Sequence, residues 1–560
     1  MWLLLFFCVL PAHAQDEPRV KIAQGTIIGS RATDGDYLTF YGIHYGGSTA
    51  GENRFKAPTE PPKYPGDFVA MNSEVICAQP SIRGIIGTED CLVLNIFTKN
   101  ITTPKPVFVW LEGEEYETTT NTLHSYKTLV QEGLLVVTIN YRLSIFGFLC
   151  LGVPEAPGNA GLKDVIQGLQ WIKENIAAFG GDPNNVMLAG HGSGAAMVDL
   201  ITLSPLAKNL IHKALVLSGS GLASWAVSYD PIGYAQKVGE KLRYTNKSPS
   251  ELARLLSTTD LGVLNGVLTD FEFYNNTPLF APCVENVKLN GTFLHDAPIN
   301  ILRSKNYNDI PYVAGYTDRE GTMRAQQVVS SNWLTEMQNK FENFVPVDLK
   351  FENNEVKTNV SDVIRKFYFA ERVINRETIE DFLDYQGDIL VFIPITRGVL
   401  ERGLTSNASV RIFEFAFRNA KNTDWLYPEI PVNGAKHGSI RNYLFNSNPS
   451  DHDRSAVTAV IRRIVAFAQT GSPAPNDLVQ WLPVRNTLDT LYISGGEVSP
   501  NVTSFKEECY VRSNERVNFW DKIIQERYQP PKPVSSASSL ISFGLIVLLT
   551  QMLVKLLSMS

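Results

Sequence analysis

The chain has 560 residues, of which 44% are hydrophobic and 19% are charged, and its 50 Lys and Arg against 57 Asp and Glu give a net charge of −7. An apolar content this high excludes an intrinsically disordered chain. The mildly acidic balance argues against nucleic-acid binding, because affinity for nucleic acids comes mostly from basic side chains that displace counterions from phosphates.

The N-terminus has the pattern of a secretory signal peptide. Residues 1–10 (MWLLLFFCVL) form an apolar run too short to span a bilayer, and Ala12-His13-Ala14 follows as a small-x-small cleavage signature. A buried N-terminal strand is the alternative interpretation. We expect residues 1–14 to be a leader peptide and residues 15–528 to form one exported domain.

Five cysteines remain once Cys8 leaves with the leader, so they cannot all pair with one another. Cys77 and Cys91 flank a short Gly-containing loop. A bridge between them would close about 15 residues and would stabilise the fold by about 3 kcal/mol, because it restricts the unfolded chain. We predict this disulfide, and we expect the remaining cysteines to be mostly buried thiols: Cys150, Cys283 and Cys509.

The middle of the chain predicts a sheet wrapped by helices. Nearly continuous apolar runs rich in β-branched residues indicate strands buried on both faces, and apolar residues at helical spacing indicate a helix that ends at a Gly pair. The expected order is strand 105–111, strand 134–141, helix 160–180, strand 186–189, turn 190–194, helix 195–203 and strand 213–219. This alternation predicts an α/β fold with a mainly parallel sheet.

The C-terminal end predicts a membrane anchor. The Pro-rich residues 529–539 are expected to form a stalk, and residues 540–560 are largely apolar. Small residues before the apolar run and the lack of a cytoplasmic tail favour a GPI-attachment signal, whereas a plain membrane span is the alternative. Either interpretation places the protein on the outer face of the plasma membrane.

Seven N-x-S/T triplets support export independently of the two ends. Their acceptor residues are Asn100, Asn246, Asn275, Asn290, Asn359, Asn407 and Asn501. We expect these residues to carry glycans on the surface of a secreted fold.

Several motifs together resemble the type-B carboxylesterase and cholinesterase family, over essentially the whole of the expected domain. They are Arg54-Phe55 with Pro58, Pro61 and Pro62, EDCLVLN at 89–95, NYRLSIFGFL at 140–149, the segment 158–186, and Ser218-Gly219-Ser220 near Trp225. The resemblance implies the α/β-hydrolase fold as a single domain. It also implies a Ser, His and Glu triad with an oxyanion hole made of backbone N–H groups.

The nucleophile position of this family is occupied by glycine. Family members read G-E-S-A-G at the strand-to-helix turn, and this chain reads Gly190-His191-Gly192-Ser193-Gly194. Ser193 is the alternative nucleophile, but the glycines that allow strand and helix to approach frame Gly192 and do not frame Ser193. We expect the Ser193 side chain to point away from the pocket, while its backbone N–H keeps an oxyanion position.

The oxyanion positions are altered as well. The family has a run of glycines after the strand that ends at Leu111, whereas this chain has Glu114 and Glu115 at the two donor positions. A carboxylate about 4 Å from a developing oxyanion costs on the order of 4 kcal/mol at an effective dielectric of 20. Loss of the serine and gain of these two charges predict that ester hydrolysis by the family mechanism is lost.

The other two triad positions match His437 as general base and Glu320 as its acid partner. We expect this pair to persist as a hydrogen-bonded structural element, since removal of one member would strand a buried polar group. The loop between Cys77 and Cys91 has no tryptophan, which disfavours the choline recognition of cholinesterases.

The resemblance implies a non-catalytic, cell-surface member of the family that binds an extracellular protein or a small-molecule ligand, since the family's inactive members act in adhesion or recognition. The alternative is a carboxylic ester hydrolase with residual or atypical activity, through Ser193 or a water activated by His437. A cation site formed by acidic residues is a further hypothesis, but its spacing matches no standard metal site. Its ligands would be Glu112, Glu114, Glu115 and Glu117, with His437. We predict neither a metal nor a cofactor.

Overall fold

The computed structural model describes residues 17–113, 115–119, 124–418, 430, 434–474, 479–499, 502–511 and 515–535. The expected signal peptide and the apolar segment 540–560 lie outside these residues. Within them, no helix is both long enough and apolar enough to cross a membrane.

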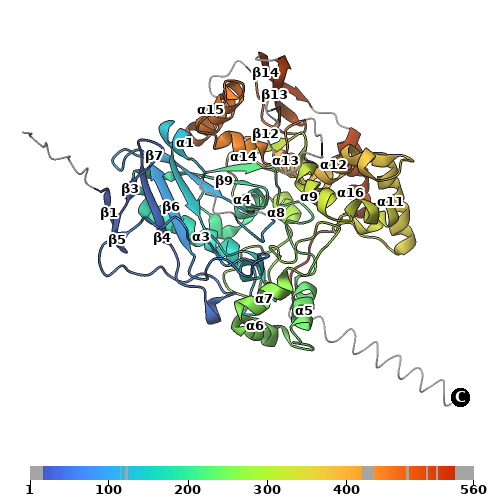
Figure 1. Ribbon diagram of the computed structural model, residues 1–560, viewed down its shortest axis with the longest axis horizontal. Coiled ribbons are helices and arrows are strands. Elements are labelled where there is room, and N and C mark those ends of the chain that lie inside the picture. The colour runs from blue at the N-terminus through green and yellow to red at the C-terminus, as the bar shows by residue number, and fades with distance from the viewer. Residues whose placement is uncertain are drawn as a thin grey trace, which may run out of the picture.

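One large mixed sheet organises the fold (Figure 1). Its strands, in spatial order, are β14 (Val502–Val511), β13 (Asp489–Ser499), β12 (Val410–Phe417), β11 (Tyr312–Thr317), β10 (Lys213–Leu217), β9 (Gly181–His191), β7 (Lys105–Leu111), β8 (Leu135–Ile139), β6 (Val93–Thr98), β4 (Leu38–His44) and β3 (Ser30–Arg31). All neighbours from β8 to β13 run parallel, and antiparallel strands extend both edges. The predicted α/β fold with a mainly parallel sheet is therefore confirmed. A small separate sheet contains β1 (Arg19–Ile22), β2 (Gly25–Ile28) and β5 (Phe68–Val69).

Helices cover both faces of the large sheet. The α-helices of the described residues are α1 (Lys127–Gln131), α2 (Ser144–Phe148), α3 (Ala160–Asn175), α4 (Ser193–Leu203), α5 (Pro231–Lys241), α6 (Pro249–Thr258), α7 (Leu261–Leu268), α8 (Pro298–Ser304), α9 (Ala325–Ser330), α10 (Trp333–Asn339), α11 (Asn354–Phe369), α12 (Ile379–Gly387), α13 (Ile393–Thr405), α14 (Ser439–Leu444), α15 (Arg454–Thr470) and α16 (Glu515–Arg527). In Figure 1, α1, α14 and α15 lie on one side of the sheet and α3, α4 and α8 on the other.

Strand β7 shows why the sheet is buried on both faces. Phe108 and Trp110 pack with α1, α14 and α15, whereas Val107 and Val109 pack with α3, α4 and α8. Successive side chains of a strand point to opposite faces, so a strand covered on both sides has no polar alternate positions. The nearly continuous apolar runs in the sequence have this cause.

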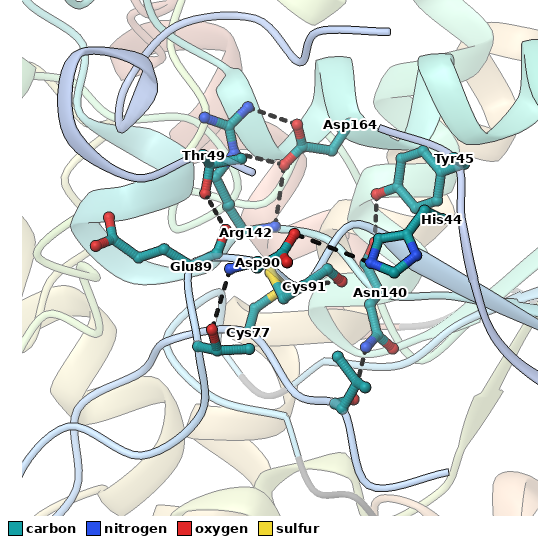
Figure 2. Close-up of a disulfide and its surroundings, with 12 residues drawn as sticks. His44, Tyr45, Thr49, Cys77, Glu89, Asp90, Cys91, Asn140, Arg142 and Asp164 are labelled. Carbon is teal, nitrogen blue, oxygen red and sulfur yellow. Dashed lines mark hydrogen bonds and ion pairs between the residues drawn. A yellow bond between two sulfur atoms is a disulfide. The ribbon is translucent and has the colours of Figure 1, made fainter. Parts of the chain in front are cut away.

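Two disulfides close loops of the described chain. Cys77 and Cys91 are bonded as predicted, with 5.0 Å between their Cα atoms, and Figure 2 shows the bond beneath Glu89 and Asp90. Cys150 and Cys283 form a second disulfide, which corrects the expectation of buried thiols. They lie 133 positions apart in the chain, so sequence spacing gave no sign of their pairing. Cys509, on the edge strand β14, is exposed, again contrary to expectation.

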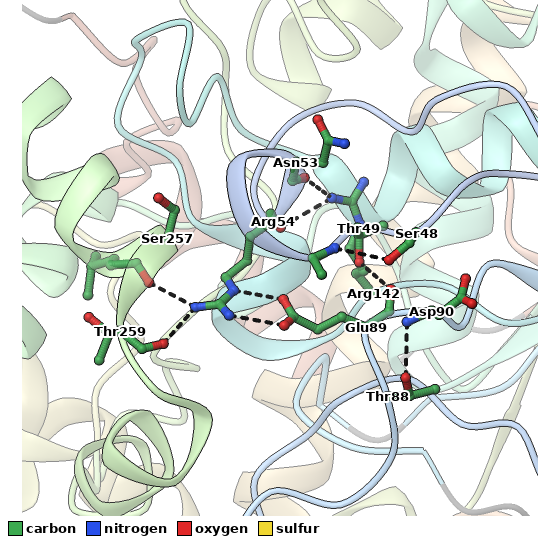
Figure 3. A network of polar contacts seen from close by, with 12 residues as sticks. Ser48, Thr49, Asn53, Arg54, Thr88, Glu89, Asp90, Arg142, Ser257 and Thr259 are labelled. Atoms are coloured by element: carbon green, nitrogen blue, oxygen red, sulfur yellow. Dashed lines mark hydrogen bonds and ion pairs between the residues drawn. The ribbon is translucent and has the colours of Figure 1, made fainter.

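The motifs that carry the family resemblance meet around two buried ion pairs, Arg54 with Glu89 (Figure 3) and Arg142 with Asp164 (Figure 2). Arg54 donates to both carboxylate oxygens of Glu89, at 2.7 and 3.0 Å, and its guanidinium also donates to the Thr259 carbonyl. Arg142 is paired in the same way with Asp164 and donates to the Arg54 carbonyl. Buried charges need paired and hydrogen-bonded partners, so these motifs hold the segments before β6 and α3 together rather than serving chemistry.

Residues 529–535, the first part of the expected stalk, pack on the domain. The Gln529 N–H donates to the Asp348 carbonyl and the Val534 N–H donates to the Val284 carbonyl. The Val534 side chain is buried against Cys150 and Cys283. The domain therefore extends at least to Val534.

Candidate functional site

The centre of the site is the sharp turn between β9 and α4. Gly192 has φ +58° and ψ −123°, a backbone conformation that is strained for residues with a side chain. A Cβ atom on Gly190 would stand 2.5 Å from Gly194, and one on Gly194 would stand 2.3 Å from the Leu111 carbonyl oxygen. The end of β9 and the start of α4 therefore lie as close together as in the nucleophile turn of an α/β-hydrolase fold. The two glycines that allow this approach, Gly190 and Gly194, stand two residues before and two residues after Gly192.

His437 and Glu320 form a coupled pair beside this turn. His437 Nδ1 lies 2.5 Å from Glu320 Oε2, and the backbone N–H of His437 donates to Thr322 Oγ1 at 2.9 Å. The other Glu320 oxygen accepts from Ser218 Oγ at 2.6 Å and from the Thr317 N–H at 2.7 Å. The glutamate follows β11 and Ser218 follows β10, so the carboxyl ends of neighbouring parallel strands deliver both to one place.

The imidazole ring of His437 faces Gly192, and no side chain lies between the two residues. A Cβ atom on Gly192 would lie 3.8 Å from His437 Nε2. Both residues line a cavity of about 190 Å³ that also contacts Trp225, Trp333 and Arg324. The predicted nucleophile, base and acid positions are therefore brought together, and the hydroxyl is the missing part.

Ser193 does not take the place of that hydroxyl. It lines the cavity, but its Oγ is buried and makes no hydrogen bond within the described part of the chain. The hydroxyl lies beside Gly113, 3.1 Å from where a Cβ on that glycine would stand. Ser193 is the first residue of α4, and no hydrogen bond joins its hydroxyl to His437.

The loop that follows β7, where the expected oxyanion positions lie, is only partly covered by the described residues. Glu114 lies outside the described residues. Glu115 adopts a left-handed conformation, with φ +53°, where the family has glycine. Its side chain is 45% exposed, lines the cavity and forms an ion pair with the buried Arg324, which also donates to Asn276 Oδ1 at 2.6 Å. The charge of Glu115 is therefore partly neutralised, which the sequence did not indicate.

Two further acidic residues of this loop have different surroundings. Glu112 accepts hydrogen bonds from Trp110, His124 and Arg441, at 2.7, 3.1 and 2.8 Å. Burial alone would raise the pKa of Glu112, but these partners lower it below its ordinary value. Burial, together with the nearby Glu115 carboxylate, raises the pKa of Glu117 to about 7. Glu112 and Glu115 thus pair with neighbouring cations and Glu117 is partly buried, and no cluster that could hold a metal ion occurs among the described residues.

A second histidine lies behind the first. His191 is buried, and its ring centroid lies 4.6 Å from that of His437. Burial and the neighbouring imidazole lower the pKa of His191 well below its ordinary value, so this residue is neutral. His191 Nε2 makes no hydrogen bond to any residue that the structure describes. The sequence marked this position only as a departure from the family motif.

The cavity walls contain residues that sequence reasoning missed. They include Phe271, Glu272, Phe273, Met323, Arg324, Trp333 and Leu390. Most come from the segments 271–279 and 323–333, which are far in sequence from the turn and carry no local motif. Of the expected glycan acceptors, Asn246, Asn290, Asn359 and Asn407 are exposed, Asn100 and Asn275 are half-buried, and Asn501 lies outside the described residues.

Comparisons with known proteins agree with the geometry. A family model described as the carboxylesterase family matches residues 16–520. The chain is 27% identical over 437 residues to venom carboxylesterase-6 of Apis mellifera, covering 74% of this chain and 78% of that protein. It is 28% identical over 567 residues to the bile salt-activated lipase of Bos taurus, covering 93% and 91%. The crystal structure of a juvenile hormone esterase from Manduca sexta superposes with a TM-score of 0.78 at 24% identity, covering 91% of this chain and 100% of that one, and shows the shared α/β-hydrolase fold.

Proposed function

The chain belongs to the carboxylesterase family, and on that premise we propose that it binds a ligand in the cavity above His437 without hydrolysing esters by the family's serine mechanism. The observation that carries this proposal is the absence of any side chain at residue 192, opposite the Nε2 atom of His437. Loss of the nucleophilic serine in a serine protease lowers kcat about a million-fold. The remaining base has only water or a ligand to act on.

The proposal places the protein on the outer face of the plasma membrane as an exported glycoprotein. Two disulfides support export, because disulfides persist mainly in oxidising compartments. Exposed sequons on separate surface segments support glycosylation. The apolar residues 540–560 would supply a GPI signal or a membrane span. The cavity favours a small-molecule ligand over an extracellular protein partner, since it is a concave site where aromatic side chains stand beside polar groups that could orient a ligand.

Ester hydrolysis is the second candidate function. The relatives reported above are named as a carboxylesterase and a lipase, and the pairing of His437 with Glu320 is intact. A water molecule in the place of the missing hydroxyl could then be activated by His437, or Ser193 could reorient. Both routes would leave a dependence on His437.

One assay separates the two candidates. The purified full-length protein and its His437→Ala variant are compared in the hydrolysis of p-nitrophenyl butyrate, and both are treated with a fluorophosphonate before intact-mass measurement. The proposal expects equal rates and no covalent adduct. A rate that falls at least ten-fold in the variant would establish hydrolysis instead, and an adduct mapped to residue 193 and absent from Ser193→Ala would identify the nucleophile.

A further inference from the structure

The missing side chain leaves a space with a defined boundary. Apart from the adjoining residues in the chain, the nearest atoms to a Cβ on Gly192 would be His437 Nε2 at 3.8 Å and the Gly113 carbonyl oxygen at 3.9 Å. Both distances are ordinary van der Waals contacts, so a group the size of one heavy atom meets no close contact there. Because Gly192 and His437 line the cavity, a ligand in the cavity can reach this space.

The boundary atoms determine what kind of group fits. Glu320 binds the Nδ1 side of the imidazole, so Nδ1 carries the proton and Nε2 is a hydrogen-bond acceptor in neutral His437. No described residue donates to Nε2. Ser193, the next residue, has a buried hydroxyl without a partner in the described chain and also lines the cavity. Within the described residues, the cavity therefore contains a hydrogen-bond acceptor, His437 Nε2, and a hydroxyl donor, Ser193 Oγ, that both lack partners.

We propose that the ligand of this protein is an uncharged molecule with an apolar body and a hydroxyl group, and that this hydroxyl occupies the space over Gly192. The hydroxyl donates to Nε2 of His437 and accepts from Oγ of Ser193. This inference rests on the proposed ligand-binding function and specifies its ligand class. A hydroxyl satisfies both boundary groups because it has one donor and two lone pairs.

The rest of the cavity supports an uncharged ligand. Among the described residues, Glu115, Glu117 and Glu272 line it, and the one Lys or Arg in the lining, Arg324, already binds Glu115. An anionic ligand such as a carboxylate would therefore meet an excess of carboxyl groups. An ammonium group could donate to Nε2 but has no lone pair for the Ser193 hydroxyl.

The aromatic and apolar walls fit the proposed body of the ligand. The indole rings of Trp225 and Trp333 and the phenyl rings of Phe271 and Phe273 line the cavity. Trp225 Nε1 donates to the Leu390 carbonyl at 2.9 Å and Trp333 Nε1 donates to Glu272 at 2.7 Å, so neither indole needs a polar ligand group. These walls gain from burying apolar surface rather than from further hydrogen bonds.

The test compares two isomers of the same formula, of which one has a hydroxyl group and the other an ether oxygen that cannot donate a hydrogen bond. Binding of 1-octanol and of 1-methoxyheptane to the full-length protein is measured by titration calorimetry, and the quenching of tryptophan fluorescence serves as a second readout. We expect 1-octanol to bind about five-fold more tightly, the ratio that one ordinary hydrogen bond supplies. Octanoate and octylammonium are measured under the same conditions and should bind more weakly than the alcohol.

Two variants locate the effect. Gly192→Ala fills the space and His437→Ala removes the acceptor, and in each the two isomers should bind with equal affinity. Equal binding of the isomers to the unmodified protein would overturn the hydroxyl assignment while leaving a ligand-binding cavity, as would tighter binding of octanoate or octylammonium. Absence of binding by all four compounds would overturn this inference and the small-molecule part of the proposed function together. The isomer ratio in the unmodified protein decides the question even where a variant fails to fold.

Discussion

His437 Nε2 lies 3.8 Å from the position of a Cβ atom on Gly192, and no other side chain stands between them. A serine at residue 192 would therefore place its hydroxyl next to the imidazole, as in an active triad. The backbone at Gly192 thus has room for a serine side chain. Whether the site could hydrolyse an ester would then depend on that side chain and on the loop that contains Glu114 and Glu115. This relationship makes the effect of restoring the serine testable.

We expect Gly192→Ser alone to leave ester hydrolysis near background, whereas Gly192→Ser combined with Glu114→Gly and Glu115→Gly gains activity. A carboxylate about 4 Å from the developing oxyanion costs on the order of 4 kcal/mol, or nearly a thousand-fold in rate. The measurement is kcat/KM for p-nitrophenyl butyrate, and His437→Ala in the triple variant is the control. A fast single variant would mean that the glutamates do not oppose the oxyanion, an outcome to which the pairing of Glu115 with Arg324 could contribute.

Glu117 should make the protein less stable as the pH rises. Its pKa is raised from 4.5 to about 7 in the folded protein, chiefly by burial. Between these values the folded state keeps a proton that the unfolded chain has released, so the free energy of unfolding falls as the pH rises through this window. Glu117→Gln should therefore be more stable than the unmodified protein at pH 8, by up to about 3 kcal/mol, and equally stable near pH 4.

Thermal unfolding of both proteins across this pH range measures the effect. The exposed Glu240→Gln variant is the matched control and should show a constant difference from the unmodified protein. A Glu117→Gln variant that tracks the unmodified protein at every pH would show that Glu117 is ionised in the fold.

Loss of the disulfide between Cys150 and Cys283 should cost more stability than loss of the one between Cys77 and Cys91. The sequence separations are 133 and 14, and the chain-entropy relation gives about 5 and about 3 kcal/mol. Paired Cys→Ala variants of each bridge are compared by urea unfolding, with Cys509→Ala as a control that should change little. The reverse order would show that strain or residual structure outweighs loop length.

Val534 should anchor the C-terminal segment to the domain. Its side chain is buried against Cys150 and Cys283, so Val534→Asp would bury an unpaired charge and lower the free energy of unfolding by about 3 kcal/mol. The exposed Lys532→Asp variant, two residues away, should change it by less than about 0.5 kcal/mol. Equal effects in a thermal-unfolding assay would mean that residues 529–535 do not hold to the domain in solution.

Several features could be predicted because the sequence encodes them locally. The strand over 105–111 was recognisable because burial on both faces requires an unbroken apolar run, and the observed β7 has the same limits. The helix from 160 was recognisable from its spacing. The strand before the turn begins at Gly181 rather than at 186, because polar residues at its start gave no alternation to detect.

The sequence alone determined the family and the fold, and the prediction that Gly192 stands at the nucleophile position also comes from the sequence, because these depend on residue identities at fixed positions along the chain. Only the tertiary structure decided that Cys150 bonds to Cys283, that Arg324 binds Glu115, and that residues 271–279 wall the cavity. Each of these contacts joins segments that are distant in the sequence, by 133 residues for the disulfide and 209 for the ion pair, and no local pattern encodes such a contact. They follow from the packing of helices on the sheet, which fixes the residues that meet.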